Sequence, residues 1–343
     1  MTIITHTIKI ILVLITVIFL FSALLFNSSV IANTTSEALA VCYFKLIPSI
    51  FPFMVLSGFF MNISGKKHTI VKNEKSYSDK YKASCFVILL SWISGFVVGP
   101  KYLCENELEQ DATSKVFLCS NAGIGFVISY VGVILWGNIF FGIFLYFIQL
   151  IWSLTIYLLI EGNSFSNNIE KFRQPIISAM TSSIQNSTRS MLDICGFTVI
   201  FSIIKNIFSK FLNSELLTLI ISSTLEISSG ALASVCNKNN LICAFFTGFT
   251  VGFGGVCMCM QTFAVCIGDN IKKLKFIEMK LIHGILCGLS SLFFVMISKV
   301  APVNQVWLNN DEFGIFGIVI SALFLCSLLN LIKKLLKNKL YSL

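Results

Sequence analysis

The chain has 343 residues, of which 56% are hydrophobic and only 12% are charged, and its mean hydropathy is +0.86. A soluble domain usually carries about twice that charged fraction, so the composition excludes a soluble protein and predicts an all-α polytopic membrane protein in contact with the lipid bilayer. The net charge of +9 does not indicate a nucleic-acid partner, because the lysines lie mostly in short loops between apolar segments and at the C-terminus.

Apolar segments near the length of a spanning helix, roughly 20 residues, follow one another from end to end. They cover residues 8–28, 41–62, 84–99, 116–132, 138–160, 190–209, 216–233, 241–267, 279–299 and 313–335. We predict that the short segments 84–99 and 216–233 are re-entrant hairpins, which leaves about eight transmembrane helices. The alternative is that all ten segments span the membrane.

The distribution of basic residues favours the hairpins. Ten spanning helices would place seven Lys and Arg residues outside, whereas two hairpins reduce that number to four. Both termini are then cytoplasmic in a bacterial cell membrane. Each half has three crossings and one hairpin, so the second half is inverted relative to the first. The predicted parts are an N-terminal helix with an external loop (1–40), a first repeat (41–160), a cytoplasmic linker (161–189), a second repeat (190–300), and a C-terminal helix with a basic tail (301–343).

Two stretches look like copies of one design. Ser91–Gly99 is followed by Phe117–Phe126, and Leu225–Ala233 is followed by Gly248–Gly255. Each copy is a short apolar segment with a Ser-Gly pair, then a longer segment interrupted by glycines, and the Ser-Gly pairs serve to align the copies. Such segments in matching positions of two halves indicate a transporter-type binding site near the bilayer midplane. Non-helical backbone at that depth needs cover from protein or a watery cavity, so we expect a polar cavity between the halves.

Glu226 is the strongest candidate for that cavity, because an ionisable group within a membrane segment is costly and indicates function. It could bind a cation, a substrate hydroxyl or amine, or a coupling proton; alternatively, it is a structural carboxyl bonded to the broken backbone of the opposite hairpin. Asn121 and Gln261 offer uncharged donors and acceptors, or are packing residues. The full set of candidate cavity residues is Glu226, Asn121, Gln261, Ser94, Gly95, Ser120, Gly123, Ser229, Gly230, Gly254 and Gly255.

No motif for catalysis stands out, since the chain has no Ser/His/Asp arrangement, phosphate loop or H-E-x-x-H. We therefore expect no enzyme, no catalytic residue and no cofactor. The twelve Cys are scattered, without a C-x-x-C or zinc spacing. The run Cys257–Met260 could attract a soft metal, but residues two apart do not share a helix face, so we expect packing and no metal site. We expect His283, which begins segment 279–299, to lie at the membrane interface.

Five motifs together support a family resemblance. They are Leu46–Met54, Ser94-Gly95 through Gly99 with Lys101, Ser120–Phe126, Glu226 with Ser229-Gly230, and Gly252–Gln261. Over roughly residues 40–300 the chain resembles membrane proteins with a nucleoside-recognition or Gate domain, and most of all the sporulation integral membrane proteins of the YlbJ type from Firmicutes. The family usually has Ser-Gly-Tyr-Pro in the first hairpin, whereas Phe96-Val97 follows Ser-Gly here.

The resemblance implies a pore or carrier core and a role in spore formation, particularly cortex assembly. The first hypothesis is a transporter-like protein that moves or senses a small polar solute during sporulation. The second is a non-transporting scaffold that assembles other sporulation membrane proteins at the spore envelope. A third is a metal-ion permease that uses Glu226 and Cys257–Met260.

Overall fold

A computed structural model describes residue 22 and residues 28–63, 88–95, 99–100, 103, 112–161, 175–209, 214–266 and 271–303. Within these residues every regular element is helical. Helices long and apolar enough to cross a membrane cover 31–63, 139–160, 176–208, 240–265 and 273–298. The prediction of an all-α membrane protein is confirmed at that level, while segment 313–335 and almost all of 8–28 lie outside the described residues.

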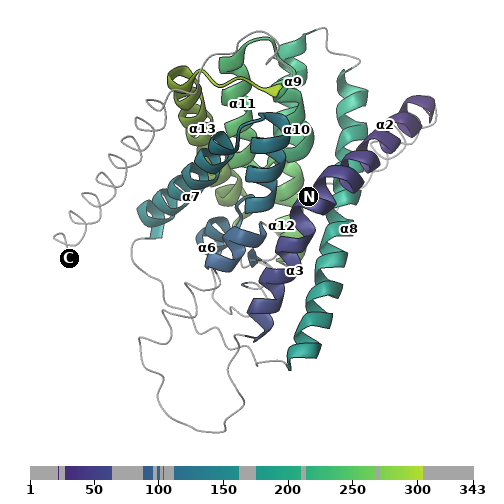
Figure 1. The fold of residues 1–343 in the computed structure, drawn as a ribbon, viewed down its shortest axis with the longest axis vertical. Helices are drawn as coiled ribbons and strands as arrows, with labels where there is room; N and C mark the ends of the chain where they lie inside the picture. Colours follow the sequence, from purple (N-terminus) through teal and green to yellow (C-terminus); the bar gives the residue numbers. More distant parts are fainter. Residues whose placement is uncertain are drawn as a thin grey trace, which may run out of the picture.

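The first half begins with a long helix and contains one broken helix (Figure 1). Helix α2 (Ser28–Val41) continues through the π-helical turn η1 (Cys42–Leu46) into α3 (Ile47–Ile63). A short helical stretch over 88–94 ends at Gly95. Helix α6 (Thr113–Cys119), the non-helical residues 120–123 and η2 (Gly125–Leu135) form the broken helix, and α7 (Ile139–Glu161) follows.

The second half repeats this order of elements. It consists of α8 (Ile176–Ser209), the short pair α9 (Glu215–Leu225) and α10 (Ile227–Val235), the broken helix α11 (Asn240–Phe253) and α12 (Gly255–Val265), and α13 (Lys273–Ser298). The segment 161–189, expected to be a linker, is helical from Ile176 on. Both halves therefore contain a long helix, a short segment that ends at a turn, a broken helix and another long helix.

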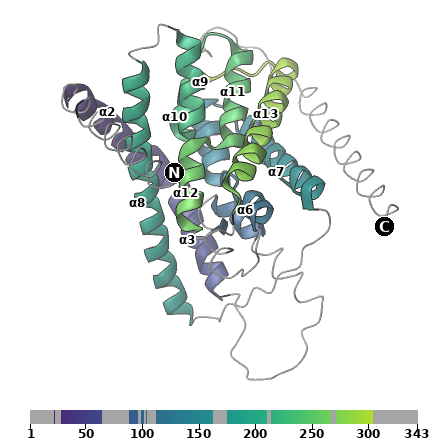
Figure 2. The same ribbon diagram turned by 180° about the vertical axis from the view of Figure 1, so that it is seen from behind.

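The corresponding long helices of the two halves run in opposite directions (Figures 1 and 2). Asn62 Nδ2 at the end of α3 donates to Ser182 Oγ near the start of α8 (3.1 Å), whereas Asn206 near the end of α8 donates to Thr34 in α2 (2.5 Å). The α2–α3 helix is therefore antiparallel to α8.

The second pair of long helices, α7 and α13, crosses in the same antiparallel sense. The rings of Phe144 and Phe294 stack with their centroids 4.3 Å apart, and Trp152 Nε1, further along α7, donates to Ser290 Oγ, earlier in α13 (2.9 Å).

Helices α11 and α13 pack unusually closely because each carries a G-x-x-x-G pair on the facing side, a pattern that lets membrane helices approach. The pairs are Gly248 with Gly252 and Gly284 with Gly288. A Cβ on Gly248 would lie 2.5 Å from the carbonyl oxygen of Cys287, closer than real Cβ atoms come to other atoms. Two of the glycines in Gly248–Gly255 thus serve helix packing, and only the last two break the helix.

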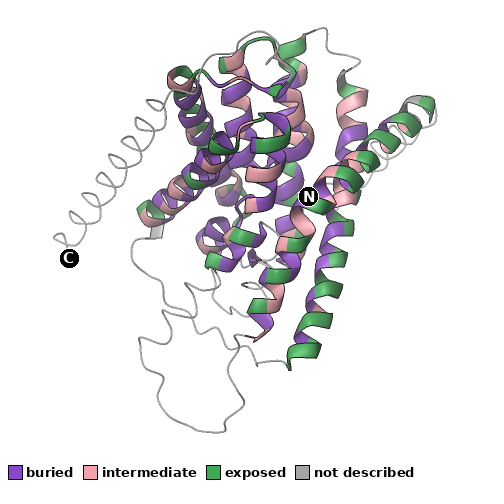
Figure 3. Cartoon of the chain, viewed as in Figure 1, coloured by how far each residue is buried: buried purple, intermediate pink, exposed green. Residues whose placement is uncertain are grey.

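Exposed residues lie along the outer faces of the bundle (Figure 3), and many of them are large and apolar. Ile177 and Leu192 on α8 are 83% and 67% exposed, and Leu274 on α13 is 77% exposed. A soluble monomer rarely exposes such extended apolar surface, whereas lipid covers it in a bilayer. The outer surface therefore agrees with the membrane assignment made from composition.

We predict that Gly248→Ala destabilises the protein, whereas Gly196→Ala does not. The added methyl on α11 meets the backbone of α13, and such overpacking costs about 1–3 kcal/mol. Gly196, on the exposed side of α8, has nothing within 4 Å of a built Cβ, and alanine there gains about 0.5–1 kcal/mol of helix propensity. The midpoint of thermal unfolding in detergent should fall by several degrees for Gly248→Ala alone; equal midpoints would contradict the close packing.

Candidate functional site

The pair α9 and α10 folds back on itself at Glu226. A Cβ on Gly230 would lie 2.7 Å from the Cα of Ser223, whereas seven residues of continuous helix span roughly 10 Å. The first short segment folds back in the same way, because a Cβ on Gly99 would overlap the side chain of Ser91. Its turn lies at Gly95, whose φ of 98° favours glycine.

The two turns correspond to each other in a register that differs from the sequence alignment. The structure matches Gly95 with Glu226, and Gly99 with Gly230, so Ser94-Gly95 is not the counterpart of Ser229-Gly230. The copies turn by different means: Gly95 adopts a positive φ, whereas Glu226 is extended (φ −148°, ψ 137°) and caps the next helix with its side chain. The shared Ser-Gly pair therefore misaligned the copies by one helical turn.

Each turn packs against the break in the helix that follows it. A Cβ on Gly95 would lie 3.1 Å from the backbone nitrogen of Gly123, and a Cβ on Gly255 would lie 2.8 Å from the carbonyl oxygen of Leu225. Glycine is needed at these contacts because the backbones touch directly. The two glycine-rich regions of each copy therefore lie side by side.

The Glu226 carboxylate is 2% exposed and forms the N-cap of α10. Its Oε1 accepts from the Ser228 backbone N–H (2.8 Å) and hydroxyl (2.5 Å), and its Oε2 accepts from the Ser229 N–H (2.6 Å). Capping of this kind satisfies amide groups that a helix start leaves free. The partners belong to its own hairpin, not to the opposite one, and within the described part of the chain no Lys or Arg is paired with this carboxylate.

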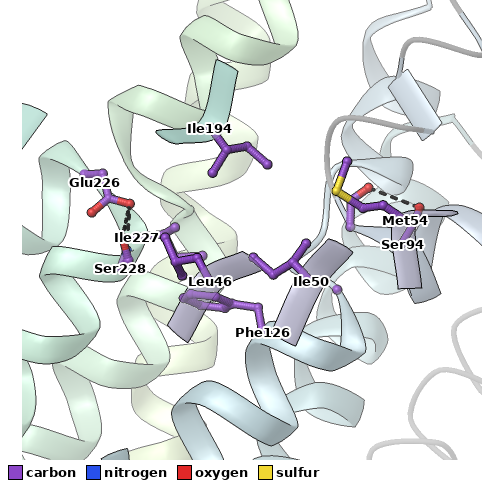
Figure 4. Close-up of a pocket in the computed structure, with 11 residues that line it drawn as sticks. Leu46, Ile50, Met54, Ser94, Phe126, Ile194, Glu226, Ile227 and Ser228 are labelled. Atoms are coloured by element: carbon purple, nitrogen blue, oxygen red, sulfur yellow. Dashed lines mark hydrogen bonds between the residues drawn. The ribbon is translucent and has the colours of Figure 1, made fainter. Parts of the chain in front are cut away.

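Both hairpin turns line one pocket (Figure 4). Of the candidate residues, Ser94 and Gly95 come from the first turn, Glu226 from the second, and Gly123 from the first break. The remaining walls are Ser228 and six apolar side chains: Leu46, Ile50, Met54, Phe126, Ile194 and Ile227. Figure 4 places Glu226 and Ser94 at opposite sides, with the apolar residues between them. The cavity is therefore more apolar than expected.

The other candidates do not line this pocket. Asn121 is buried, and its Nδ2 donates to the Leu118 carbonyl (2.8 Å) and to Ser153 Oγ (3.0 Å). Gln261 Nε2 lies 3.4 Å from Cys257 Sγ in its own helix. The rest of the set, Ser120, Ser229, Gly230, Gly254 and Gly255, belongs to the breaks and the α9–α10 hairpin. These residues belong to the same breaks and hairpin as the lining residues, but they lie outside the pocket lining.

Sequence reasoning missed a buried polar group on α13. His283 is 0% exposed and Lys280 is 1% exposed, so both side chains point into the protein and not toward the surface. Lys280 Nζ donates to the Ser120 carbonyl in the first break, and His283 Nε2 lies 2.8 Å from the Gln149 carbonyl oxygen. Their spacing of three residues on one helix face was the only sequence signal that these two residues act together.

The part of the chain that the structure describes holds no group of three or more His, Cys, Asp and Glu side chains that could bind a metal ion. In the run Cys257–Met260 the two cysteines are buried, whereas Met260 is 48% exposed on the outer surface. The soft ligands of this run therefore do not converge on one point.

Comparison of the chain with protein-family models, with curated proteins and with solved structures finds no match.

We predict that Glu226→Ala lowers stability more than Glu226→Gln. Alanine leaves the Ser228 and Ser229 amides without a cap, which costs about 0.5–2 kcal/mol, whereas glutamine keeps one acceptor oxygen. Thermal unfolding of the purified variants should rank wild type, Gln and Ala in falling order. The control is Glu215→Ala at the exposed start of α9, which should leave the midpoint near that of wild type. Equal midpoints for wild type and Glu226→Ala would show that the cap is dispensable.

Proposed function

We propose that the chain is a multi-pass protein of the bacterial cell membrane with a transporter-like core, which moves or senses a small solute held between the two hairpin turns. One observation carries the proposal: turns from both halves line a single pocket, and each turn packs against a broken helix. Transporters with repeated halves bind solutes at the interface of the repeats, next to discontinuous helices.

The membrane arrangement that we propose is an inverted repeat with two re-entrant hairpins. Its support is the shared order of elements and the antiparallel pairs α3 with α8 and α7 with α13. Each hairpin then enters and leaves on one side, and the broken helices α6–η2 and α11–α12 cross. Together with the predicted helices in 8–28 and 313–335, this arrangement has eight crossings, and both termini are cytoplasmic.

The lining suggests the kind of solute. Glu226 Oε1 already accepts two hydrogen bonds, whereas Oε2 accepts one and can accept another from a ligand. The apolar walls cannot satisfy many hydroxyl groups, and a buried polar group without a partner is costly. We therefore propose a small solute with one hydrogen-bond donor or positive charge, directed at Glu226, and an apolar part that packs between Phe126 and Ile194.

A role in spore cortex formation, together with other sporulation membrane proteins, is part of the proposal. Its support is the resemblance in Leu46–Met54 and in the two hairpins with their breaks. Leu46, Ile50 and Met54 of that first motif line the pocket, which gives the motif a direct part in solute binding.

The arrangement predicts that the loops 102–112 and 163–173 face the cytoplasm. Single cysteines introduced there in a Cys-depleted background should react with an impermeant thiol reagent only after the cells are permeabilised. A cysteine introduced in the loop between α10 and α11, at Lys238, is the control, because this loop faces outward and should react in intact cells. Labelling of both test loops in intact cells would mean that all ten segments span and that the repeats are parallel.

We predict that Ile194→Phe, which fills the pocket, weakens solute binding at least tenfold, since about 1.4 kcal/mol of steric cost is enough. Leu192→Phe on the exposed face of α8 (67% exposed) is the matched control. A panel of small amines and alcohols can be screened on the purified wild type for a rise in unfolding temperature, which specific binding produces by mass action. A ligand whose affinity is equal in the two variants would not occupy this pocket.

A further inference from the structure

Carbonyl groups at the end of α6 and in the first break accept hydrogen bonds from side chains of three other elements. Trp92 Nε1 donates to the Leu118 carbonyl (2.9 Å), Gln149 Nε2 to that of Ala122 (2.8 Å), and Lys280 Nζ to that of Ser120. The second break is shorter, because Gly254 and Gly255, with φ of 79° and 83°, turn the chain within two residues. The first break thus has more non-helical residues than the second, and a charged side chain, Lys280, binds to it.

The surroundings of the Lys280 ammonium group are ones that attract a cation. The Ser120 carbonyl lies at the C-terminal end of α6, where a helix carries partial negative charge and attracts cations. The ammonium also lies 5.3 Å from the ring centroid of Phe117, within the range of a cation–π interaction. Among the described residues no carboxylate is paired with Lys280, so a backbone carbonyl and an aromatic face take the place of a counter-ion.

In transporters with broken helices, unwound carbonyls and the C-terminal ends of half-helices are where coupling ions bind. We propose that the Lys280 ammonium is a tethered cation that occupies this position in the first break, so that the break is stable without a free monovalent ion. Lys280 is then a positioning residue: it fixes the Ser120 end of the break, three residues before Gly123 in the pocket wall.

Two further oxygens fit the same interpretation. Asn121 Oδ1 and Gln149 Oε1 are buried in the described structure without a hydrogen-bond partner, while their amide nitrogens bond to Leu118 and Ala122 of the same segment. Amide and carbonyl oxygens are ligands that small hard cations accept. Removing the lysine side chain would leave the Ser120 carbonyl without its partner and leave space beside it for a small cation.

The test compares unfolding temperatures of the purified full chain in NaCl, LiCl, KCl, methylammonium chloride and choline chloride at equal ionic strength. We expect the wild type to be equally stable in all five salts. Lys280→Ala should unfold about 5 °C lower in choline and recover at least half of that loss in NaCl or methylammonium chloride. Lys280→Met, whose side chain fills the space without a charge, should be destabilised and show no recovery.

Lys275→Ala on the same helix removes an equal charge from a partly exposed position and should behave as the wild type. The proposal is overturned if Na⁺ or Li⁺ stabilises the wild type over choline, or if Lys280→Ala shows no recovery in any salt, including a failure to fold in all of them. In that last case the lysine has a packing role only. No solute is used, so the result is independent of the proposed solute site.

Discussion

Backbone that leaves the helix inside a bilayer must still satisfy its hydrogen bonds, and the rest of this structure follows from that constraint. No water competes for a free carbonyl in the hydrocarbon region, so each one requires a partner from the protein. The break at 120–123 obtains side-chain partners from α7 and α13, and the last turn of α6 before it obtains one from the first hairpin. These elements have to lie around the break, which fixes the packing of the first hairpin and links the two halves of the chain through α13.

The two breaks satisfy their backbone hydrogen bonds in different ways, and in this respect the two halves of the chain differ. In the second half two glycines complete the turn, and Gly255 packs directly against the backbone of Leu225. In the first half the break extends over four residues and needs Lys280, the largest charged group that is fully buried in the described structure. A pseudo-symmetric backbone therefore carries an asymmetric distribution of charge: a carboxylate at the second turn, and an ammonium at the first break.

The sequence predicted the elements well because hydrophobic length and glycine position report directly on them. Within the described residues the chain folds back at Gly95 and at Glu226, while the prediction that these folds are re-entrant hairpins in a membrane stays a prediction. The register of the copies could not be predicted, because a glycine turn and a carboxylate-capped turn have no residue in common. The role of Gly248 and Gly252 was also hidden, since a glycine that packs against α13 and one that breaks a helix look alike in a single sequence.

The buried polar residues were the hardest to place for a physical reason. Lys280 and His283 follow a basic loop, and a lysine near a helix end usually extends to the membrane surface. Only the carbonyl freed at Ser120, more than 150 residues earlier in the chain, makes an inward position favourable. Interactions between distant segments of this kind leave no local pattern, which also explains why the apolar pocket residue Ile194 on α8 was not recognised from the sequence.

In the first break, the residues that stabilise the unwound segment differ from the residue that lines the pocket. Asn121, Gln149 and Lys280 hold the unwound segment but do not line the pocket, whereas Gly123, at the end of the same segment, does. In the proposed site a solute would meet apolar side chains, Ser94 and glycine backbone from the first half, and the carboxylate of Glu226 from the second. Since the apolar walls offer it little hydrogen bonding, orientation of the solute depends on Glu226, whose cap to α10 already fixes the carboxylate before any ligand arrives.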